Sequence, residues 1–335
     1  MTSCWRTNKP DTKEQNESTA LSNGRILLEK QIAFCNGKSN PLRIFSANEL
    51  EKATDNYNPN KIITRDSGYN LYRGLLQEER PVSIKKFKEN FEQYEYCFND
   101  ILFASKMSVH KNFLKLLGCC LETQVPVLVF ESVEYGTLAD RIYGPEITLY
   151  QPLLWVNRLK IAMEIANAVA YLHSAFEKPI VFRNIKPLNI FLDECSIAKL
   201  SDFSIAVSIP EGESHVNDPV AGAWGLIAPE YAATERFNER QDVYNFGVFL
   251  LILLTGKMAI DHSRTDPGLV DHVKEHIEGN KFDEILDSRI VGKDDQLQGF
   301  MEVSLKCISE AEENRPVMIE VAKELRKIYK SAISI

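Results

Sequence analysis

Residues 181–192 read Val-Phe-Arg-Asn-Ile-Lys-Pro-Leu-Asn-Ile-Phe-Leu, and this stretch decides the fold. Between two apolar flanks it places Arg183, Lys186 and Asn189 at intervals of three residues, with Asn184 directly after the arginine. A single stretch can arise by chance, so the other motifs along the chain are stronger evidence than this one alone. Those motifs come in a fixed order: Val82-Ser83-Ile84-Lys85, Ser201-Asp202-Phe203-Ser204, Ala228-Pro229-Glu230, Asp242-Val243-Tyr244-Asn245-Phe246-Gly247 and Arg315-Pro316. Alone, a lysine after Val-x-Ile is usually a solvated strand end, and Asp-Phe is usually a turn; the combination indicates a fold.

Together these stretches resemble the landmarks of eukaryotic protein kinases. The resemblance implies an α+β, bilobal protein-kinase fold with a β-rich N-lobe and an α-helical C-lobe. It also implies a nucleotide site in which Lys85 contacts the phosphates of ATP, while Asn189 and Asp202 hold the metal ion. In the C-lobe of this family the Glu of Ala-Pro-Glu pairs with a late arginine, so Glu230 and Arg315 are expected to form a buried ion pair.

The catalytic loop departs from the family pattern His-Arg-Asp-x-x-x-x-Asn, in which the Asp accepts the proton of the substrate hydroxyl. Phe182 stands in the His position, and Asn184 stands in the base position. A side-chain amide cannot accept that proton, so no intact set of catalytic residues is expected. Loss of the base alone typically lowers a rate by a factor of about 10² to 10⁴.

The parts that would hold the phosphates depart from the family as well. Residues 64–69 read Thr-Arg-Asp-Ser-Gly-Tyr where the Gly-rich loop is expected, and none of its three pattern glycines is in place. Glycine lets backbone amides close on phosphates without a Cβ in the way, whereas Asp66 adds negative charge and Tyr69 adds bulk. Asp100, not Glu, occupies the helix position that should pair with Lys85, and its side chain is one methylene shorter.

The activation segment shows a third departure. Ser204 replaces the Gly of Asp-Phe-Gly, and Ala223 stands where active Ser/Thr kinases carry a Thr that bonds the catalytic Asp and Lys. Residues 215–233 contain no Ser or Thr at all. Arg183 is therefore expected to have no phosphate to receive in this part of the segment.

The chain divides into four predicted parts: a disordered N-terminus (1–22), an N-terminal helical extension (23–56), a kinase-like N-lobe (57–130) and a kinase-like C-lobe (131–330). The extension has a clear helix start, because Ser46 is placed as an N-cap with Glu49 closing a capping box.

Within the lobes, helical spacing of apolar residues predicts one helix at residues 94–107 and a core helix at residues 155–174. Phe130 is expected at the gatekeeper position. The hinge follows it, and there Glu131 and Val133 are the expected neighbours of a nucleotide.

Composition excludes several classes of protein. The 335 residues are 44% apolar and carry a net charge of −8 without a basic block, so nucleic acid is not an expected partner. Seven cysteines without a C-x-x-C spacing indicate reduced thiols in a cytoplasmic protein. No apolar stretch reaches the roughly 20 residues of a membrane span.

The resemblance can be narrowed by three further stretches. Residues 44–57 (Ile-Phe-Ser-Ala-Asn-Glu-Leu-Glu-Lys-Ala-Thr-Asp-Asn-Tyr), 116–123 (Leu-Leu-Gly-Cys-Cys-Leu-Glu-Thr) and 125–131 (Val-Pro-Val-Leu-Val-Phe-Glu) resemble plant receptor-like kinases of the wall-associated type. Because no membrane span precedes them, the chain is similar to receptor-like cytoplasmic members. With its altered loops, it is most similar to the plant immune pseudokinases related to the one required for recognition of the HopZ effector.

That group implies a set of partners for this chain: a nucleotide-binding leucine-rich-repeat immune receptor, other receptor-like cytoplasmic kinases and bacterial effectors. The expected location is the cytoplasm, with association to the plasma membrane through partners.

The hypothesis from sequence is a catalytically deficient pseudokinase that acts as an adaptor or decoy in innate immunity. It requires no cofactor, and ATP and Mg²⁺ are expected to bind weakly at the vestigial site. Two alternatives stay open: a weak serine/threonine kinase with an unorthodox base, supported by the retained Lys85, Asn189 and Asp202, and a scaffold switched by ATP without phosphotransfer.

Overall fold

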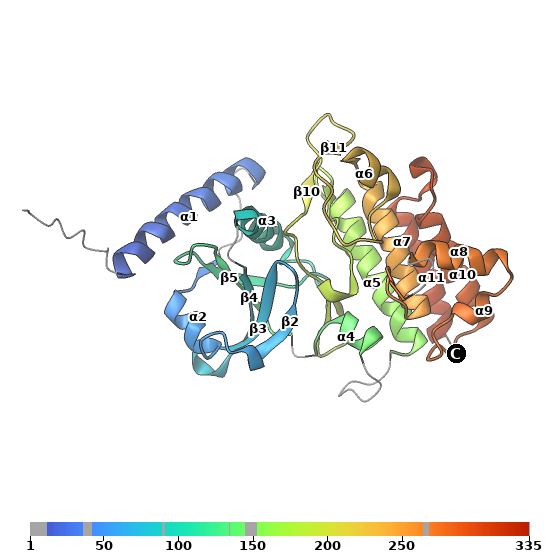
Figure 1. The fold of residues 1–335 in the computed structure, drawn as a ribbon, viewed down its shortest axis with the longest axis horizontal. Coiled ribbons are helices and arrows are strands. Elements are labelled where there is room, and N and C mark those ends of the chain that lie inside the picture. The colour runs from blue at the N-terminus through green and yellow to red at the C-terminus, as the bar shows by residue number, and fades with distance from the viewer. Residues whose placement is uncertain are drawn as a thin grey trace, which may run out of the picture. The chain divides into compact units, whose positions relative to one another are not determined.

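The computed structural model describes residues 12–35, 42–88, 91–133, 135–144, 153–263 and 268–334. The chain forms two compact units (Figure 1). The first comprises Met1–Met107 and Lys115–Ser132, and the second comprises Ser108–Leu114 and Val133–Ile335. Residues 1–11, for which disorder was predicted, and Glu134 of the hinge lie outside the described residues.

The first unit is built on a six-stranded sheet with the strand order β1-β5-β6-β4-β3-β2. Neighbouring strands are antiparallel, apart from the parallel pair β1 and β5. The strands are β1 (Arg43–Ile44), β2 (Ile62–Arg65), β3 (Tyr69–Leu75), β4 (Pro81–Phe87), β5 (Leu116–Cys120) and β6 (Val127–Glu131). The helices of this unit are α1 (Thr12–Cys35), α2 (Ala47–Ala53) and α3 (Phe91–Met107), with short 3-10 turns η1 (Pro59–Lys61) and η2 (Gln77–Glu79). The predicted helix at 94–107 is thus present and begins three residues earlier.

Helix α1 corrects the predicted boundary of the N-terminal extension. The sequence placed residues 1–22 in a disordered segment, but the helix begins at Thr12. Residues 12–22 contain no Gly or Pro, so the helix continues backward from its packed half without a break. That half is anchored by Asn23, whose Nδ2 donates to the carbonyls of Leu121 at 2.9 Å and Thr123 at 3.0 Å.

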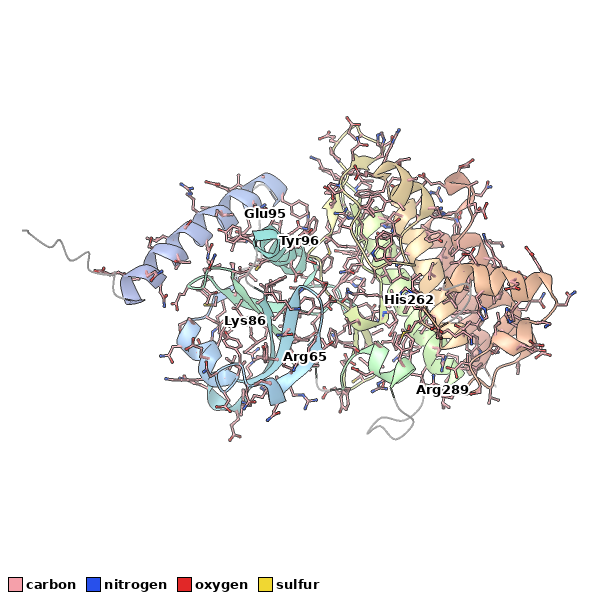
Figure 2. The ribbon with its side chains drawn as sticks, in the orientation of Figure 1. Arg65, Lys86, Glu95, Tyr96, His262 and Arg289 are labelled. Atoms are coloured by element: carbon pink, nitrogen blue, oxygen red, sulfur yellow. The ribbon has the colours of Figure 1, made fainter. Side chains whose placement is uncertain are left out.

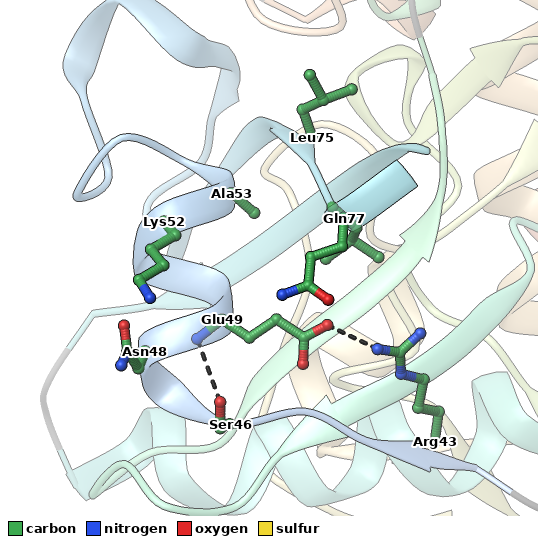
Figure 3. Close-up of a pocket in the computed structure, with 9 residues that line it drawn as sticks. Arg43, Ser46, Asn48, Glu49, Lys52, Ala53, Leu75 and Gln77 are labelled. Carbon is green, nitrogen blue, oxygen red and sulfur yellow. Dashed lines mark hydrogen bonds and ion pairs between the residues drawn. The ribbon is translucent and has the colours of Figure 1, made fainter. Parts of the chain in front are cut away.

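Helix α2 begins as predicted at its Ser46 cap, but its capping box is only half formed. The Glu49 backbone N–H donates to Ser46 Oγ at 3.2 Å, whereas the Glu49 carboxylate pairs with Arg43 at 2.6 Å (Figure 3). The strand pair β1 and β5 places Arg43 within reach, and a charged partner wins over a neutral backbone N–H.

The second unit is mainly helical. Its helices are α4 (Leu138–Tyr143), α5 (Trp155–Ser174), α6 (Pro229–Thr234), α7 (Arg240–Thr255), α8 (Leu269–Glu278), α9 (Phe282–Ile285), α10 (Asp294–Cys307) and α11 (Met318–Ile333). Three two-stranded ribbons carry its loops: β7 (Ile180–Val181) with β10 (Val207–Ser208), β8 (Ile190–Leu192) with β9 (Ala198–Leu200), and β11 (Val216–Asn217) with β12 (Arg236–Phe237). The 3-10 turns η3 (Pro187–Asn189) and η4 (Glu312–Asn314) complete it. Helix α5 has the predicted bounds, and α7 is buried along nearly its whole length, as expected of a helix that is apolar on all sides.

Residues 108–114 correct the predicted N-lobe boundary, because they pack on the second unit. Asn112 Nδ2 donates to the carbonyl of Ala198 at 2.9 Å, and the Leu114 N–H donates to the carbonyl of Leu200 at 3.0 Å. Every residue has a backbone carbonyl, so the sequence does not reveal these two hydrogen bonds. The predicted N-lobe (57–130) therefore included residues 108–114.

The second unit contains a group of two arginines around one buried carboxylate. Arg158 is fully buried and contacts Asp287 at 2.6 Å, while Arg289 contacts the same carboxylate at 2.7 Å (Figure 2 labels Arg289). Burial by itself raises the pKa of Asp287, but hydrogen bonds from Arg289 and Arg158 outweigh it and lower that pKa to about 2. Asp287 therefore stays ionised at neutral pH.

The predicted pair of Glu230 and Arg315 is confirmed, with one qualification on burial. Arg315 Nη1 and Nη2 reach the two Glu230 oxygens at 2.6 and 2.9 Å. The Arg315 side chain is 0% exposed, but the Glu230 side chain is 27% exposed, so the pair is buried on one side only. Arg315 also donates from Nε to the carbonyl of Ser309.

In the described parts of the chain, no helix combines the length and the apolar character that crossing a bilayer requires.

Replacing Arg315 with Ala should lower the free energy of unfolding by about 3 kcal/mol, because it leaves Glu230 without its bidentate partner and empties a buried site. Chemical denaturation of the purified protein measures this. Lys274→Ala is the control, since Lys274 and Glu310 form an exposed pair at 2.7 Å and its loss should be undetectable. Equal losses in both variants would contradict the structural role of Arg315.

Candidate functional site

The loop at residues 181–192 is held by the first turn of α7. The backbone N–H groups of Phe182 and Arg183 both donate to the Asp242 carboxylate at 2.7 Å. His173 Nε2 lies 2.8 Å from the same carboxylate, which is fully buried. Arg183 is held with a positive φ of 63°, a conformation that needs such support in a non-glycine residue.

A second side chain of α7, that of Asn245, fixes the backbone of Ile185 in the loop. Asn245 Oδ1 accepts from the Ile185 N–H at 2.8 Å, and its Nδ2 donates to the Ile185 carbonyl at 2.9 Å. From the sequence, Asp242 and Asn245 were used only as part of one of the ordered stretches. Buried polar side chains near the start of an otherwise apolar helix were the signal that they bind something.

The residue in the base position donates a hydrogen bond. Asn184 Nδ2 lies 2.8 Å from Asp202 Oδ2, and both residues are buried. An ionised carboxylate can only accept, so the nitrogen of the amide must face it. Asn189 Nδ2 in turn donates to the backbone carbonyl of Asn184 at 3.1 Å. The structure thus brings Asn184, Asn189 and Asp202 together, as the family spacing implied.

This arrangement supplies few ligands for a divalent ion. Mg²⁺ prefers oxygen ligands and usually one or two carboxylates. Among Asn184, Asn189 and Asp202, only Asp202 has a carboxylate, and the amide N–H₂ of Asn184 is directed at one of its oxygens. Across the ranges that the structure covers, no group of three or more His, Cys, Asp or Glu side chains could hold a metal ion. The two residues that hold the metal ion in the family, Asn189 and Asp202, are both present, but one Asp202 oxygen already accepts from the Asn184 amide.

Phe182, in the His position, takes part in an aromatic stack. Its ring meets Phe203 edge-on, with centroids 5.0 Å apart and planes at 88°. Phe113 also contacts Phe203, with centroids 5.4 Å apart. The three rings form one cluster. Edge-on aromatic pairs stabilise beyond their buried area.

The first unit contains the lysine of the sequence motif. Lys85 Nζ lies 2.6 Å from Asp100 Oδ2, and both side chains are buried. The expected impairment of this pair is wrong, since the shorter Asp side chain reaches the lysine. Lys85 on β4 and Asp100 on α3 therefore form the ion pair that the family makes with Glu.

Tyr69 covers the same lysine. Lys85 Nζ lies 4.0 Å from the centroid of the Tyr69 ring and 4.7 Å from that of Phe87. Tyr69 and Phe87 are cross-strand partners on β3 and β4, which sets both rings beside Lys85 on β4. The ammonium is thus enclosed by a carboxylate and two aromatic faces, an arrangement that stabilises the cation in place. Tyr69 was predicted to add bulk where phosphates would lie, and its ring is 5% exposed and packed on the lysine.

The turn between β2 and β3 is closed by its own groups. The Asp66 N–H donates to the Tyr69 carbonyl at 2.9 Å, and the Asp66 carboxylate accepts from the Ser67 hydroxyl at 3.0 Å. The carboxylate thus lies in the turn, where a Gly-rich loop would present bare amides.

The residues expected at the hinge are buried or bonded to the backbone. Phe130 is buried, and Glu131 at the end of β6 accepts from the Lys115 N–H at 3.1 Å through its carboxylate. Val133, in the second unit, is buried.

Comparison with known proteins places the chain in a family. Residues 67–325 match the family model described as protein tyrosine and serine/threonine kinase. The chain belongs to the protein kinase family.

Three relatives from Arabidopsis thaliana narrow its place there. The chain is 46% identical to the non-functional pseudokinase ZED1 (92% of this chain, 96% of ZED1) and 43% identical to the serine/threonine-protein kinase ZRK1 (95% and 94%). It is 40% identical to wall-associated receptor kinase-like 4, covering 93% of this chain but 42% of that longer protein. The predicted likeness to wall-associated kinases and their pseudokinase relatives is confirmed. The relatives' names include both a pseudokinase and a kinase.

Replacing Asn184 with Ala should lower the free energy of unfolding by about 1–3 kcal/mol, because it removes a donor from the buried Asp202 carboxylate. Denaturant unfolding measures it, with Asn167→Ala on the exposed face of α5 as the control. An unchanged stability in Asn184→Ala would show that the bond to Asp202 contributes nothing.

Proposed function

We propose that this chain is a catalytically deficient pseudokinase that acts by contact, as an adaptor or decoy in plant innate immunity. The observation that carries the proposal is the hydrogen bond from Asn184 Nδ2 to Asp202 Oδ2 at 2.8 Å. Asn184 in the base position cannot accept a proton from a substrate. Its amide instead donates a hydrogen bond to Asp202, the residue that holds the metal ion in the family.

The lysine and its neighbours in the first unit support the same proposal. Lys85 is paired with Asp100 and covered by Tyr69, so an incoming phosphate must displace an aromatic ring before it reaches the ammonium. Phosphoryl transfer depends on positioning and charge stabilisation. With the base absent, one Asp202 oxygen bound by the Asn184 amide and the lysine covered, the losses compound. ATP and Mg²⁺ binding is accordingly proposed to be weak, and no cofactor is required.

Contact surfaces are present in both units. On α1, Leu21, Leu28 and Ile32 are 77%, 56% and 54% exposed, and their spacing of seven and four residues puts them on one face of the helix. In the activation segment Trp224 is 77% exposed. Exposed aromatic and aliphatic side chains of this size are frequent anchors of protein interfaces.

A polar cavity beside α2 adds to the surface of the first unit. It measures ≈ 460 Å³ and is lined by Arg43, Ser46, Asn48, Glu49, Lys52, Ala53, Leu75, Leu76 and Gln77 (Figure 3). The capped helix α2 is thus a further candidate surface.

The partners proposed follow from the likeness to the pseudokinase group: a nucleotide-binding leucine-rich-repeat immune receptor, other receptor-like cytoplasmic kinases and bacterial effectors. The proposed location is the cytoplasm, with association to the plasma membrane through these partners.

The purified chain should transfer no phosphate to itself or to a generic substrate with ATP and Mg²⁺ or Mn²⁺, and Asn184→Asp alone should stay inactive because Tyr69 and Asp66 still occupy the phosphate loop. Radiolabel transfer measures the activity, and a thermal-shift titration with Mg-ATP measures binding. A ligand at 100 times its dissociation constant would add about 2.7 kcal/mol of stability, and we expect no such gain.

One observation favours a nucleotide-switched scaffold or a weak kinase instead, namely the intact pair of Lys85 and Asp100 at 2.6 Å. A large rise in melting temperature with Mg-ATP that Lys85→Ala abolishes would establish nucleotide binding and favour the switched scaffold. Phosphotransfer by the unaltered chain, lost in the same variant, would overturn the pseudokinase proposal.

Leu28→Glu on α1 or Trp224→Ala should weaken co-precipitation with a candidate immune receptor or a partner kinase at least about tenfold, the effect of losing one interface anchor. Lys85→Ala and Asp202→Ala should leave binding unchanged. Val291→Glu is the matched surface control, because Val291 is 90% exposed and lies on neither surface. Loss of binding in the two nucleotide-site variants, with no effect from Leu28→Glu and Trp224→Ala, would contradict contact through these surfaces.

A further inference from the structure

The Arg183 side chain is directed at the activation segment. It is buried, and it donates hydrogen bonds to a backbone carbonyl, a carboxylate and a hydroxyl group of the chain. Nε donates to the carbonyl of Ile205 at 2.7 Å, and Nη1 donates to Asp218 Oδ2 at 2.7 Å and to the Tyr231 hydroxyl at 2.9 Å. The guanidinium also lies over the Phe237 ring, 4.7 Å from its centroid.

Asp218 is the only one of these partners that carries a negative charge. Its side chain is 41% exposed, whereas that of Arg183 is 3% exposed, so the carboxylate closes a buried cationic pocket from the solvent side. A phosphate on a neighbouring Ser or Thr would meet Arg183 with the same kind of charge-assisted hydrogen bond. No Ser or Thr lies between residues 215 and 233, and the Ser214 hydroxyl is bonded to His215 at 3.0 Å.

The backbone around Asp218 is tied down by the same network. The Asp218 N–H donates to the carbonyl of Glu235 at 3.0 Å, directly after the ribbon of β11 and β12. The Tyr231 hydroxyl donates to the carbonyl of Pro219 at 2.7 Å and accepts from the Ala221 N–H at 2.9 Å. One arginine, one carboxylate and one phenol therefore link the loop, the segment and α6.

We infer that Asp218 is a permanent substitute for a phosphorylated residue, and that it holds the activation segment in one conformation without any modification of the chain. Because the carboxylate belongs to the amino-acid sequence, the segment that contains Trp224 is ordered as soon as the chain folds and needs no phosphorylation. This inference concerns the conformation of the segment and stands whether or not the chain is an adaptor. Asp218 is a positioning residue, since it acts through Arg183.

Hydrogen exchange on the full chain tests the inference at two amides, those of Asp218 and Ala221, which are bonded to Glu235 and Tyr231. In Asp218→Ala, exchange across residues 216–222 should rise about tenfold or more, the effect of losing a hydrogen bond to a charged group. Asp218→Asn, which keeps the shape and loses the charge, should show most of the same rise. Glu213→Gln, an exposed acid in the same segment, is the matched control and should change nothing. The Leu200 amide, bonded to Asn112, reports whether the second unit as a whole stays folded.

The decisive experiment repeats the hydrogen exchange with added inorganic phosphate. In Asp218→Ala the emptied Arg183 pocket should take up the ion, so added phosphate should slow the exchange of residues 216–222 while chloride at equal ionic strength should not. In the unaltered protein, phosphate should have no effect because the pocket is filled. Unchanged exchange in Asp218→Ala, an equal rise in Glu213→Gln, or a failure of phosphate to slow exchange in the alanine variant would overturn the inference.

Discussion

The carboxylate of Asp242 is the point on which the rest of the site depends. It is fully buried, and it accepts from two consecutive backbone N–H groups of the loop, those of Phe182 and Arg183. Buried polar groups must be hydrogen-bonded, so neither the loop nor the start of α7 can move without leaving a charge unsatisfied. The loop is thereby shaped by its backbone and by α7, and not by the side chain in the base position.

That separation explains how the base can be lost without loss of the fold. Asn184 is nearly the same size as Asp and lies on a backbone that is already fixed, so its amide can donate to Asp202 at 2.8 Å. Two carboxylates at that distance repel unless a cation or a proton lies between them. An amide beside a carboxylate needs neither. The same replacement of a mobile ligand by a resident side chain occurs at Lys85, whose ammonium is covered by Tyr69, and at Arg183, which is closed by Asp218.

The three substitutions act on different parts of the family's site but share one physical consequence. Each satisfies within the chain a charge that an active kinase satisfies with metal, nucleotide or phosphate. The proposed recognition by contact needs a kinase surface that does not depend on ligands, and internal partners at these positions would supply one. In that proposal, the exposed residues of α1 and Trp224 are the apolar anchors.

The sequence by itself determined the kinase fold, the order of its landmarks, the pair of Glu230 and Arg315 and the identity of the residues in the base and His positions. These depend on residue types at short, fixed spacings, which one chain displays directly. Only the tertiary structure decided that Asp100 reaches Lys85, that α1 begins at Thr12 and that residues 108–114 pack on the second unit. It alone decided that Asp218, 35 residues from Arg183, completes that arginine's pocket. Such contacts join groups far apart in the sequence, often through backbone carbonyls that every residue possesses, so no local pattern of side chains can announce them.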